Sequence, residues 1–119
     1  MPKALLVDDS AFMRMMIKDV LTQEGFDITE AENGVEAVAL CKLIDFDFIT
    51  LDITMPDMDG IAALEEIRHV NSRAYIVMMS AMGQQFFIKK ALTCGANDFL
   101  IKPFTKETLR SYVRKVQFP

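Results

Sequence analysis

The stretch Phe99-Leu100-Ile101-Lys102-Pro103, at residues 99–103, joins a short apolar run to a lysine. Three other apolar runs also end in polar residues able to bind or transfer a chemical group: Leu5-Leu6-Val7 before Asp8-Asp9, Phe48-Ile49-Thr50-Leu51 before Asp52, and Ile76-Val77-Met78-Met79 before Ser80. In an open α/β sheet, the carboxyl ends of parallel strands lie along one edge, where ligands bind. The sequence therefore predicts one pocket lined by three carboxylates, a hydroxyl and an ammonium group.

Longer segments with helical periodicity separate these runs, and this alternation is typical of βαβ units on a parallel sheet. Strands are expected at residues 3–7, 26–31, 46–51, 75–79 and 98–101. A helix is expected after each strand, with Gly83 opening the fourth helix and the fifth lying over 105–116. The alternating pattern of 26–31 indicates an edge strand, whereas the more continuous apolar run of 46–51 indicates a strand buried on both faces.

These elements predict an α/β fold of the flavodoxin-like (βα)5 type, in a single domain over residues 1–119. Five parallel strands would form the sheet in the order 2-1-3-4-5, with helices on both faces. The edge-like second strand agrees with that order, which is a known property of this fold rather than a result of the pattern.

The composition limits the classes of partner. The chain of 119 residues has a formal net charge of −4 and a pI of about 4.9. An acidic protein is a poor match for nucleic acid, because phosphate backbones bind basic surfaces. No apolar stretch approaches the roughly 20 residues of a transmembrane helix, and the start becomes acidic too soon for a signal peptide. We therefore expect a cytoplasmic monomer that neither inserts into membranes nor binds nucleic acid directly.

The three carboxylates at strand ends indicate a metal site. Asp8, Asp9 and Asp52 would repel one another at one edge of the sheet, and a hard divalent cation relieves that repulsion. Mg²⁺ prefers oxygen ligands, with waters and phosphate oxygens completing an octahedron. An isolated Asp-Asp pair usually only caps a helix, but the polar residues at the other strand ends favour a Mg²⁺ site here.

Lys102 and Ser80 extend this interpretation from metal binding to group transfer. The lysine can neutralise an anion bound beside Asp52, and the serine hydroxyl can donate to it. An anion held by a metal, a lysine and a hydroxyl next to a carboxylate describes phosphoryl transfer onto Asp52. Since the pocket would repel a phosphate donor without its cation, phosphorylation is expected to depend on the metal.

At this point the chain resembles the receiver domain of two-component response regulators over its whole length. The resemblance is carried by four stretches: Val7-Asp8-Asp9-Ser10, residues 51–60 (LDITMPDMDG), Ser80-Ala81 and Ile101-Lys102-Pro103-Phe104. Two further stretches, residues 12–16 (FMRMM) and 80–85 (SAMGQQ), look like those of stand-alone, CheY-like chemotaxis regulators.

The resemblance implies a role for each carboxylate. Asp52 would accept a phosphoryl group from a histidine kinase, CheA-like in a chemotaxis system. Asp9 and Asp52 would ligate Mg²⁺ together with the backbone carbonyl of Thr54, and Asp8 would hold a metal-bound water. By the same resemblance, Lys102 would pair with phosphoryl oxygens, and the bond between Lys102 and Pro103 would be cis.

Ser80 and Phe99 are expected to form the switch that senses the phosphoryl group. Ser80 replaces the threonine that is more frequent in the family, which keeps the hydroxyl. Phe99 stands where many relatives have tyrosine, so it lacks a phenolic hydrogen bond and can act only by ring packing. The resemblance implies that Ser80 moves toward the phosphoryl group and that Phe99 turns into the space it leaves.

A partner surface is expected around Phe86, which follows helical spacing that turns it away from the core. An exposed aromatic side chain is a common anchor for a protein partner. Four cations would surround it: Lys89, Lys90, Lys106 and Arg110. On an acidic protein, this patch suits an acidic peptide, and the resemblance implies an output partner such as a flagellar motor switch protein.

The favoured interpretation is a phosphorylation-controlled binding module of chemotaxis that is not a dedicated enzyme. An end at Pro119 leaves no room for an output domain, although the chain would also fit the receiver half of a larger, DNA-binding regulator. Residues 57–60 (DMDG) resemble the signature of Mg²⁺-dependent phosphohydrolases of the haloacid-dehalogenase type, but Asp57 follows Pro56 in a loop instead of ending a strand. Flavin binding is disfavoured because an acidic loop after the first strand is a poor phosphate cradle.

Overall fold

The computed structural model describes residues 1–53, 59–81 and 85–116. The strands are β1 (Lys3–Val7), β2 (Asp27–Ala31), β3 (Phe48–Asp52), β4 (Tyr75–Ser80) and β5 (Asp98–Ile101). The helices are α1 (Ala11–Gln23), α2 (Gly34–Leu43), α3 (Gly60–Val70), α4 (Gln85–Thr93) and α5 (Lys106–Arg114). Within the described ranges, no helix is long and apolar enough to cross a membrane.

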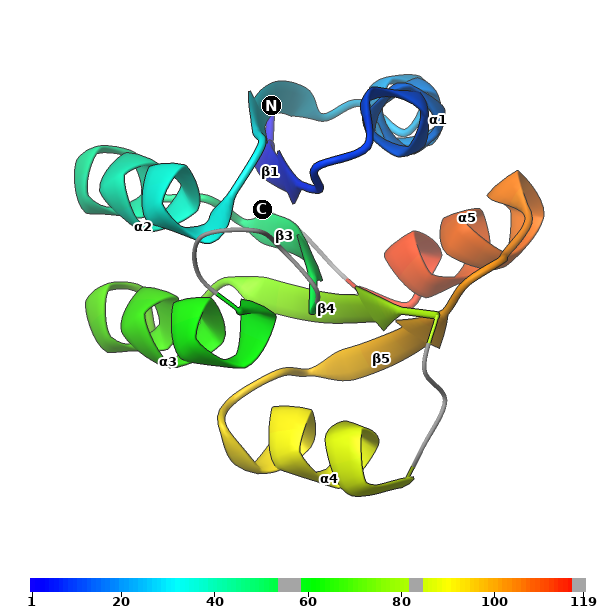
Figure 1. The fold of residues 1–119 in the computed structure, drawn as a ribbon. Helices are drawn as coiled ribbons and strands as arrows, with labels where there is room; N and C mark the ends of the chain where they lie inside the picture. The colour runs from blue at the N-terminus through cyan, green and yellow to red at the C-terminus, as the bar shows by residue number, and fades with distance from the viewer. Residues whose placement is uncertain (54–58, 82–84, 117–119) are drawn as a thin grey trace.

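The five strands form one parallel sheet in the order β2-β1-β3-β4-β5, as predicted. Helices α2, α3 and α4 cover one face, and α1 and α5 cover the other (Figure 1). Every residue of β3 is buried, whereas β2 forms an edge, so both strand predictions are confirmed. The flavodoxin-like fold is therefore confirmed. The predicted opening of the fourth helix at Gly83 lies outside the described residues.

Short polar residues at the carboxyl edge of the sheet fix where the helices begin. Side-chain oxygens accept hydrogen bonds from backbone N–H groups in the first turns of four helices; these caps are Ser10, Asn33, Asp59 and Thr105. Such caps satisfy N–H groups that have no partner inside a helix. Because each cap follows a strand by a few residues, the strand ends and the loops after them are held in place.

At the opposite edge of the sheet, Arg68 of α3 binds the segments that precede β4 and β5. Its guanidinium donates to the carbonyls of Gly95 at 2.7 Å and Ala74 at 2.8 Å, and to Asn97 Oδ1 at 2.9 Å. Asn97 Oδ1 also accepts from Ile76 N, which ties the turn before β5 to the start of β4. Burial lowers the pKa of Arg68. The network holds the turn between α4 and β5 against α3.

Candidate functional site

The structure brings the three predicted carboxylates together. Asp8 and Asp9 directly follow β1, and Asp52 is the last residue of β3 on the neighbouring strand. One carboxylate oxygen from each lies within 4.8 Å of the others. Asp8 and Asp52 are only 1% and 7% exposed, while Asp9 is exposed. Two buried acids and one accessible acid therefore share one edge of the sheet.

Lys102, directly after β5, reaches back into this cluster. Its Nζ donates to Asp8 Oδ2 at 2.8 Å and lies 3.6 Å from Asp52 Oδ2. The backbone of the lysine is fixed as well, because its N–H donates to the Ser80 carbonyl at 2.8 Å. The bond from Lys102 to Pro103 is cis, as the family resemblance implied. One ammonium thus offsets part of the charge of two buried carboxylates.

Asp8 is held in place through both its backbone and its carboxylate. Besides the contact with Lys102, its Oδ1 accepts from Ser10 N at 2.9 Å, and its own N–H donates to the Ala31 carbonyl at 3.2 Å. These bonds fix both the backbone and the carboxylate of Asp8. Asp9, in contrast, is exposed to solvent.

Ser80 completes the row of polar residues. It is buried at the end of β4. In the sheet it stands opposite Ile101 of β5, and Ile101 directly precedes Lys102. On its other side, Asp52 of β3 stands opposite Met79. Ser80 therefore lies on the strand between the one that carries Asp52 and the one that precedes Lys102.

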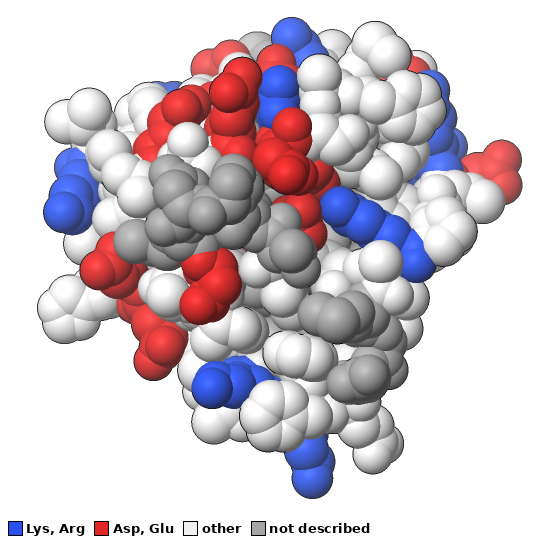
Figure 2. Space-filling view, viewed as in Figure 1, with Lys and Arg blue, Asp and Glu red and all other residues white. Residues whose placement is uncertain are grey.

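The donor set fits a hard divalent cation. All three carboxylates offer oxygen, the ligand atom that Mg²⁺ prefers, and neither sulfur nor imidazole belongs to the cluster. Figure 2 shows acidic side chains gathered on the face of the molecule over the ends of β1 and β3. Such a concentration of negative charge attracts cations. The residues present therefore fit a site for a hard cation.

A model of the response regulator receiver domain matches residues 4–114. The chain belongs to this family. Its receiver domain is 50% identical over 114 residues to the chemotaxis protein CheY of Bacillus subtilis, and the match covers 95% of each chain. By this similarity, it is a CheY-like receiver domain, a signalling module rather than a dedicated enzyme.

Two further relatives show the range of proteins that contain such a domain. A solved complex of CheX with CheY, beryllium fluoride and Mg²⁺ from Borrelia burgdorferi matches with a TM-score of 0.88 and 37% identity; it covers 98% of this chain and 90% of that one. The regulatory protein AtoC of Escherichia coli is 37% identical over 113 residues, and the match covers 95% of this chain but 24% of AtoC. The same domain therefore also occurs as a part of larger regulators.

The switch role of Ser80 and Phe99 stays a prediction. Phe99 is buried in this structure, at 8% exposure. The ring packs in the core on the side of α2, α3 and α4, and Phe99 stands opposite Met78 in the sheet. An apolar ring without a hydroxyl has no polar group that must remain at the surface, so the core is its favoured environment.

The expected partner surface is only partly assembled. Phe86 is 67% exposed on α4, and Lys90 Nζ lies 6.0 Å from the centre of its ring; Lys89 is exposed on the same helix. The other two cations point elsewhere: Lys106 pairs with Asp19, and Arg110 donates to Gln23. Both acceptors belong to α1, which packs against α5 and offers closer polar partners than the Phe86 ring.

Two groups of predicted residues remain to be placed. Thr54 and Asp57 lie outside the described residues, so the predicted carbonyl ligand stays a prediction. Asp59, the second acid of the DMDG stretch, caps α3 by accepting from Ala62 N at 2.8 Å. That carboxylate thus has a structural role, and the strand end is occupied by Asp52, so the geometry gives no support to a phosphohydrolase.

Sequence reasoning did not single out two residues that shape the receiver site. Gly60 begins α3 so close to β3 that a Cβ atom would lie 2.3 Å from the Asp52 carbonyl oxygen. Arg14 of α1 donates to the Asp8 carbonyl at 2.6 Å. For Gly60, the signal is a glycine directly after a capping acid. For Arg14, it is an arginine one turn after the acidic pair.

Proposed function

We propose that this receiver domain is a phosphorylation-activated response regulator in which Asp52 accepts a phosphoryl group from a histidine kinase. The observation that carries the proposal is the position of Asp52, within 4.8 Å of two other carboxylates and 3.6 Å from the Lys102 ammonium. A carboxylate beside a bound cation and a lysine is placed to attack an electrophilic phosphorus.

The transfer step follows from the chemistry of the two partners. An oxygen of the Asp52 carboxylate forms a bond to phosphorus while the bond from phosphorus to the donor imidazole nitrogen breaks. The electron pair of that bond returns to the imidazole, which can then take up a proton. Hydrolysis restores the free Asp52 carboxylate. Water attacks phosphorus, the bond from phosphorus to the carboxylate oxygen breaks, and inorganic phosphate is released.

The metal ligands proposed are Asp9, Asp52 and the carbonyl of Thr54, with Asp8 holding a bound water. When present, Mg²⁺ supplies positive charge to the phosphoryl oxygens and removes the repulsion between donor and acceptor. Lys102 supplies a second positive charge next to Asp52, from the side of β5. Ser80 lies between them and can donate to a phosphoryl oxygen.

We infer that the output is a change in partner binding within chemotaxis, in the cytoplasm. The similarity to CheY of Bacillus subtilis supports the pathway, with a CheA-like kinase as donor and a flagellar motor switch protein as one output partner. The exposed Phe86 with Lys89 and Lys90 suits an acidic peptide segment of such a partner. The match to part of AtoC supports the alternative, a receiver that acts within a larger regulator.

Phosphorylation of the purified protein tests the acceptor. The protein is mixed with acetyl phosphate and Mg²⁺, and the mass is measured before peptide mapping. We expect the gain of one phosphoryl group on the peptide that contains Asp52, and none in Asp52→Asn, because an amide oxygen is a poor nucleophile. Asp59→Asn is the matched control, since that acid only caps α3. Equal yields in EDTA and in Mg²⁺, or a full yield in Asp52→Asn, contradict the proposal.

Ser80→Ala tests whether the hydroxyl transmits the signal. Ser80 is buried beside the proposed acceptor strand, so its loss should leave phosphoryl uptake within about tenfold of wild type while it weakens the response of the partner. The measurement is the affinity for the output partner with and without acetyl phosphate. Ser80→Thr should retain the response, because it keeps the hydroxyl. An unchanged affinity gain in Ser80→Ala would remove Ser80 from the switch.

A further inference from the structure

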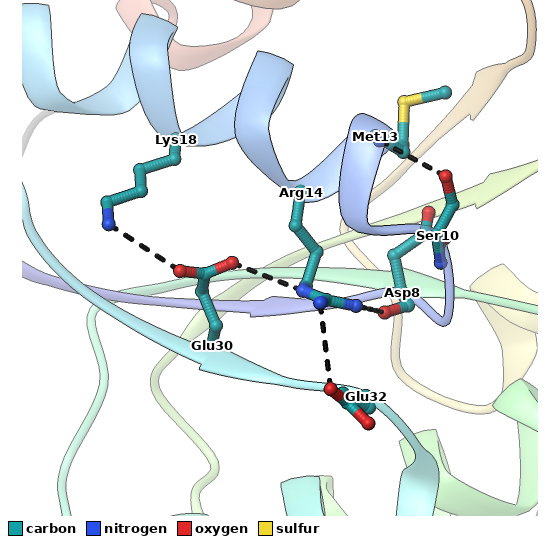
Figure 3. A network of polar contacts seen from close by, with 7 residues as sticks. All are labelled: Asp8, Ser10, Met13, Arg14, Lys18, Glu30 and Glu32. Atoms are coloured by element: carbon teal, nitrogen blue, oxygen red, sulfur yellow. Dashed lines mark hydrogen bonds and ion pairs between the residues drawn. The ribbon is translucent and has the colours of Figure 1, made fainter.

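Arg14, the fourth residue of α1, makes several polar contacts next to the acidic pair. Its side chain is only 12% exposed. The guanidinium donates to the Asp8 carbonyl at 2.6 Å and to Glu30 Oε1 at 3.1 Å, and it lies 3.8 Å from Glu32 Oε1 (Figure 3). These partners come from the loop after β1, from β2 and from the loop after β2.

The Asp8 carbonyl lies where neither the sheet nor the helix supplies an ordinary donor. β1 ends at Val7, and the first helical hydrogen bond of α1 runs from Arg14 N to the Ser10 carbonyl. The Asp8 carbonyl falls between these two systems, and the Arg14 guanidinium donates to it. A charge-assisted bond of this kind is stronger than a neutral one. It fixes the peptide plane that links Asp8 to Asp9.

We propose that Arg14 is a positioning residue of the metal site, which holds the peptide between Asp8 and Asp9 so that the exposed Asp9 carboxylate stays aimed at Asp52. This inference rests on the proposed function, because it assumes that the cluster of Asp8, Asp9 and Asp52 binds a cation. Asp8 has its own carboxylate contacts with Ser10 and Lys102. Asp9 is exposed, so the backbone before it determines its direction most directly.

Glu30, one of the partners of Arg14, also contacts a second cation of α1. Glu30 lies on β2, and its second oxygen is 3.6 Å from Lys18 Nζ, so cations from two turns of α1 hold it (Figure 3). The planar guanidinium reaches the carbonyl and both glutamates at once, which a lysine, with a single charged atom, cannot do. An unbroken path of contacts therefore runs from β2 through Arg14 to the acidic pair.

The charges around Arg14 distinguish two possible effects of its removal on metal affinity. A cation near a metal site repels the metal, and Glu30 and Glu32 offset that repulsion. If Arg14 acted only through its charge, its removal would tighten metal binding. If it positions the acidic pair, its removal loosens metal binding despite the lost repulsion. Outer residues that orient metal ligands typically change metal affinity by about 10- to 100-fold.

The test is Mn²⁺ binding to the full, unphosphorylated chain, measured by electron paramagnetic resonance, because Mn²⁺ accepts the same oxygen ligands. We expect Arg14→Gln to raise the Kd by about tenfold, and Arg14→Lys to restore part of the affinity. Lys18→Gln is the matched control: it loses one contact with Glu30 but none with the Asp8 carbonyl, so its Kd should stay within about twofold of wild type.

A second measurement shows whether Arg14→Gln changes only the backbone near Asp9 or disturbs the whole fold. In a two-dimensional amide spectrum of Arg14→Gln, the Asp9 and Ser10 resonances should shift or broaden, while those of β4 and β5 stay at their wild-type positions. If Arg14→Gln does not fold, Arg14→Lys carries the test, with an expected Kd about threefold above wild type.

Several outcomes would overturn the role of Arg14. These are an unchanged or lower Kd in Arg14→Gln, an unchanged Kd in Arg14→Lys when Arg14→Gln is unfolded, and the unfolding of both variants, which would assign the residue to the fold alone. Failure of the proposed function looks different, because wild-type protein would then bind no Mn²⁺ in the absence of any phosphodonor.

Discussion

Replacing Gly60 with alanine is expected to destabilise the protein by about 3 kcal/mol and to distort the proposed phosphorylation site at Asp52. A Cβ atom at this position would lie 2.3 Å from the Asp52 carbonyl oxygen and 2.5 Å from the Ile53 Cα, and neither backbone atom can move without moving the end of β3. The bond from Gly60 N to the Ile53 carbonyl, at 2.6 Å, would be strained as well. Urea unfolding measures the stability, and acetyl phosphate labelling measures the site.

Gly25→Ala is the control for the Gly60 experiment. Gly25 has a φ of 91°, which L residues rarely adopt, but a Cβ atom there would meet nothing within 4 Å. Its substitution carries only the cost of the backbone conformation, about 1–2 kcal/mol, at a position far from the carboxylates in the fold. Phosphoryl uptake by the folded variant should therefore be unchanged. A Gly60→Ala variant as stable as wild type would show that α3 can shift away from β3 without cost.

Replacing Lys102 with glutamine should move two properties of the site in opposite directions. The rate of phosphoryl uptake should fall by at least about a hundredfold, because the phosphoryl oxygens lose a preorganised positive charge. The affinity for Mg²⁺ or Mn²⁺ should rise by about tenfold, because the cation no longer meets a competing ammonium. That ammonium now lies 2.8 Å from Asp8 and 3.6 Å from Asp52. Stopped-flow labelling and metal titration measure the two effects separately.

Lys106→Gln provides a matched loss of one positive charge. Lys106 pairs with Asp19 on α1 and has no contact with the three carboxylates. Both the labelling rate and the metal affinity should stay within about twofold of wild type, since exposed ion pairs contribute little. Weaker metal binding in Lys102→Gln would mean that the lysine organises the carboxylates rather than competing with the metal for them.

Much of the fold and the centre of the site could be predicted from the order of residues alone. Apolar runs mark the strands, and parallel strands must end at the same edge, so Asp52 and Lys102 meet although 50 positions separate them. The two-residue periodicity also distinguished the edge strand from the buried β3. These features depend on backbone geometry and burial, which the sequence pattern reports directly.

The directions of long side chains could not be predicted in the same way. Lys106 and Arg110 were predicted to surround Phe86, but their partners are on α1, 87 positions away in each case. A flexible cation goes to whichever acceptor the tertiary packing brings close. Arg14 was missed for the same reason, since its acceptors are a backbone carbonyl and glutamates of other elements. Gly60 was missed as well, because its close approach to the end of β3 becomes visible only in the folded structure.

The Arg68 network has a mechanical consequence for signalling. It secures the carboxyl end of α4 through the Gly95 carbonyl and through Asn97, on the side of the sheet remote from the carboxylates. Because Gly95 follows the last residue of α4 by only two positions, we expect a tilt of the helix to be smallest at that end. The greatest displacement then falls at the opposite tip, near Gln85 and Phe86. A change at the proposed acceptor Asp52 that moves α4 would therefore displace the exposed Phe86 more than the residues near Gly95.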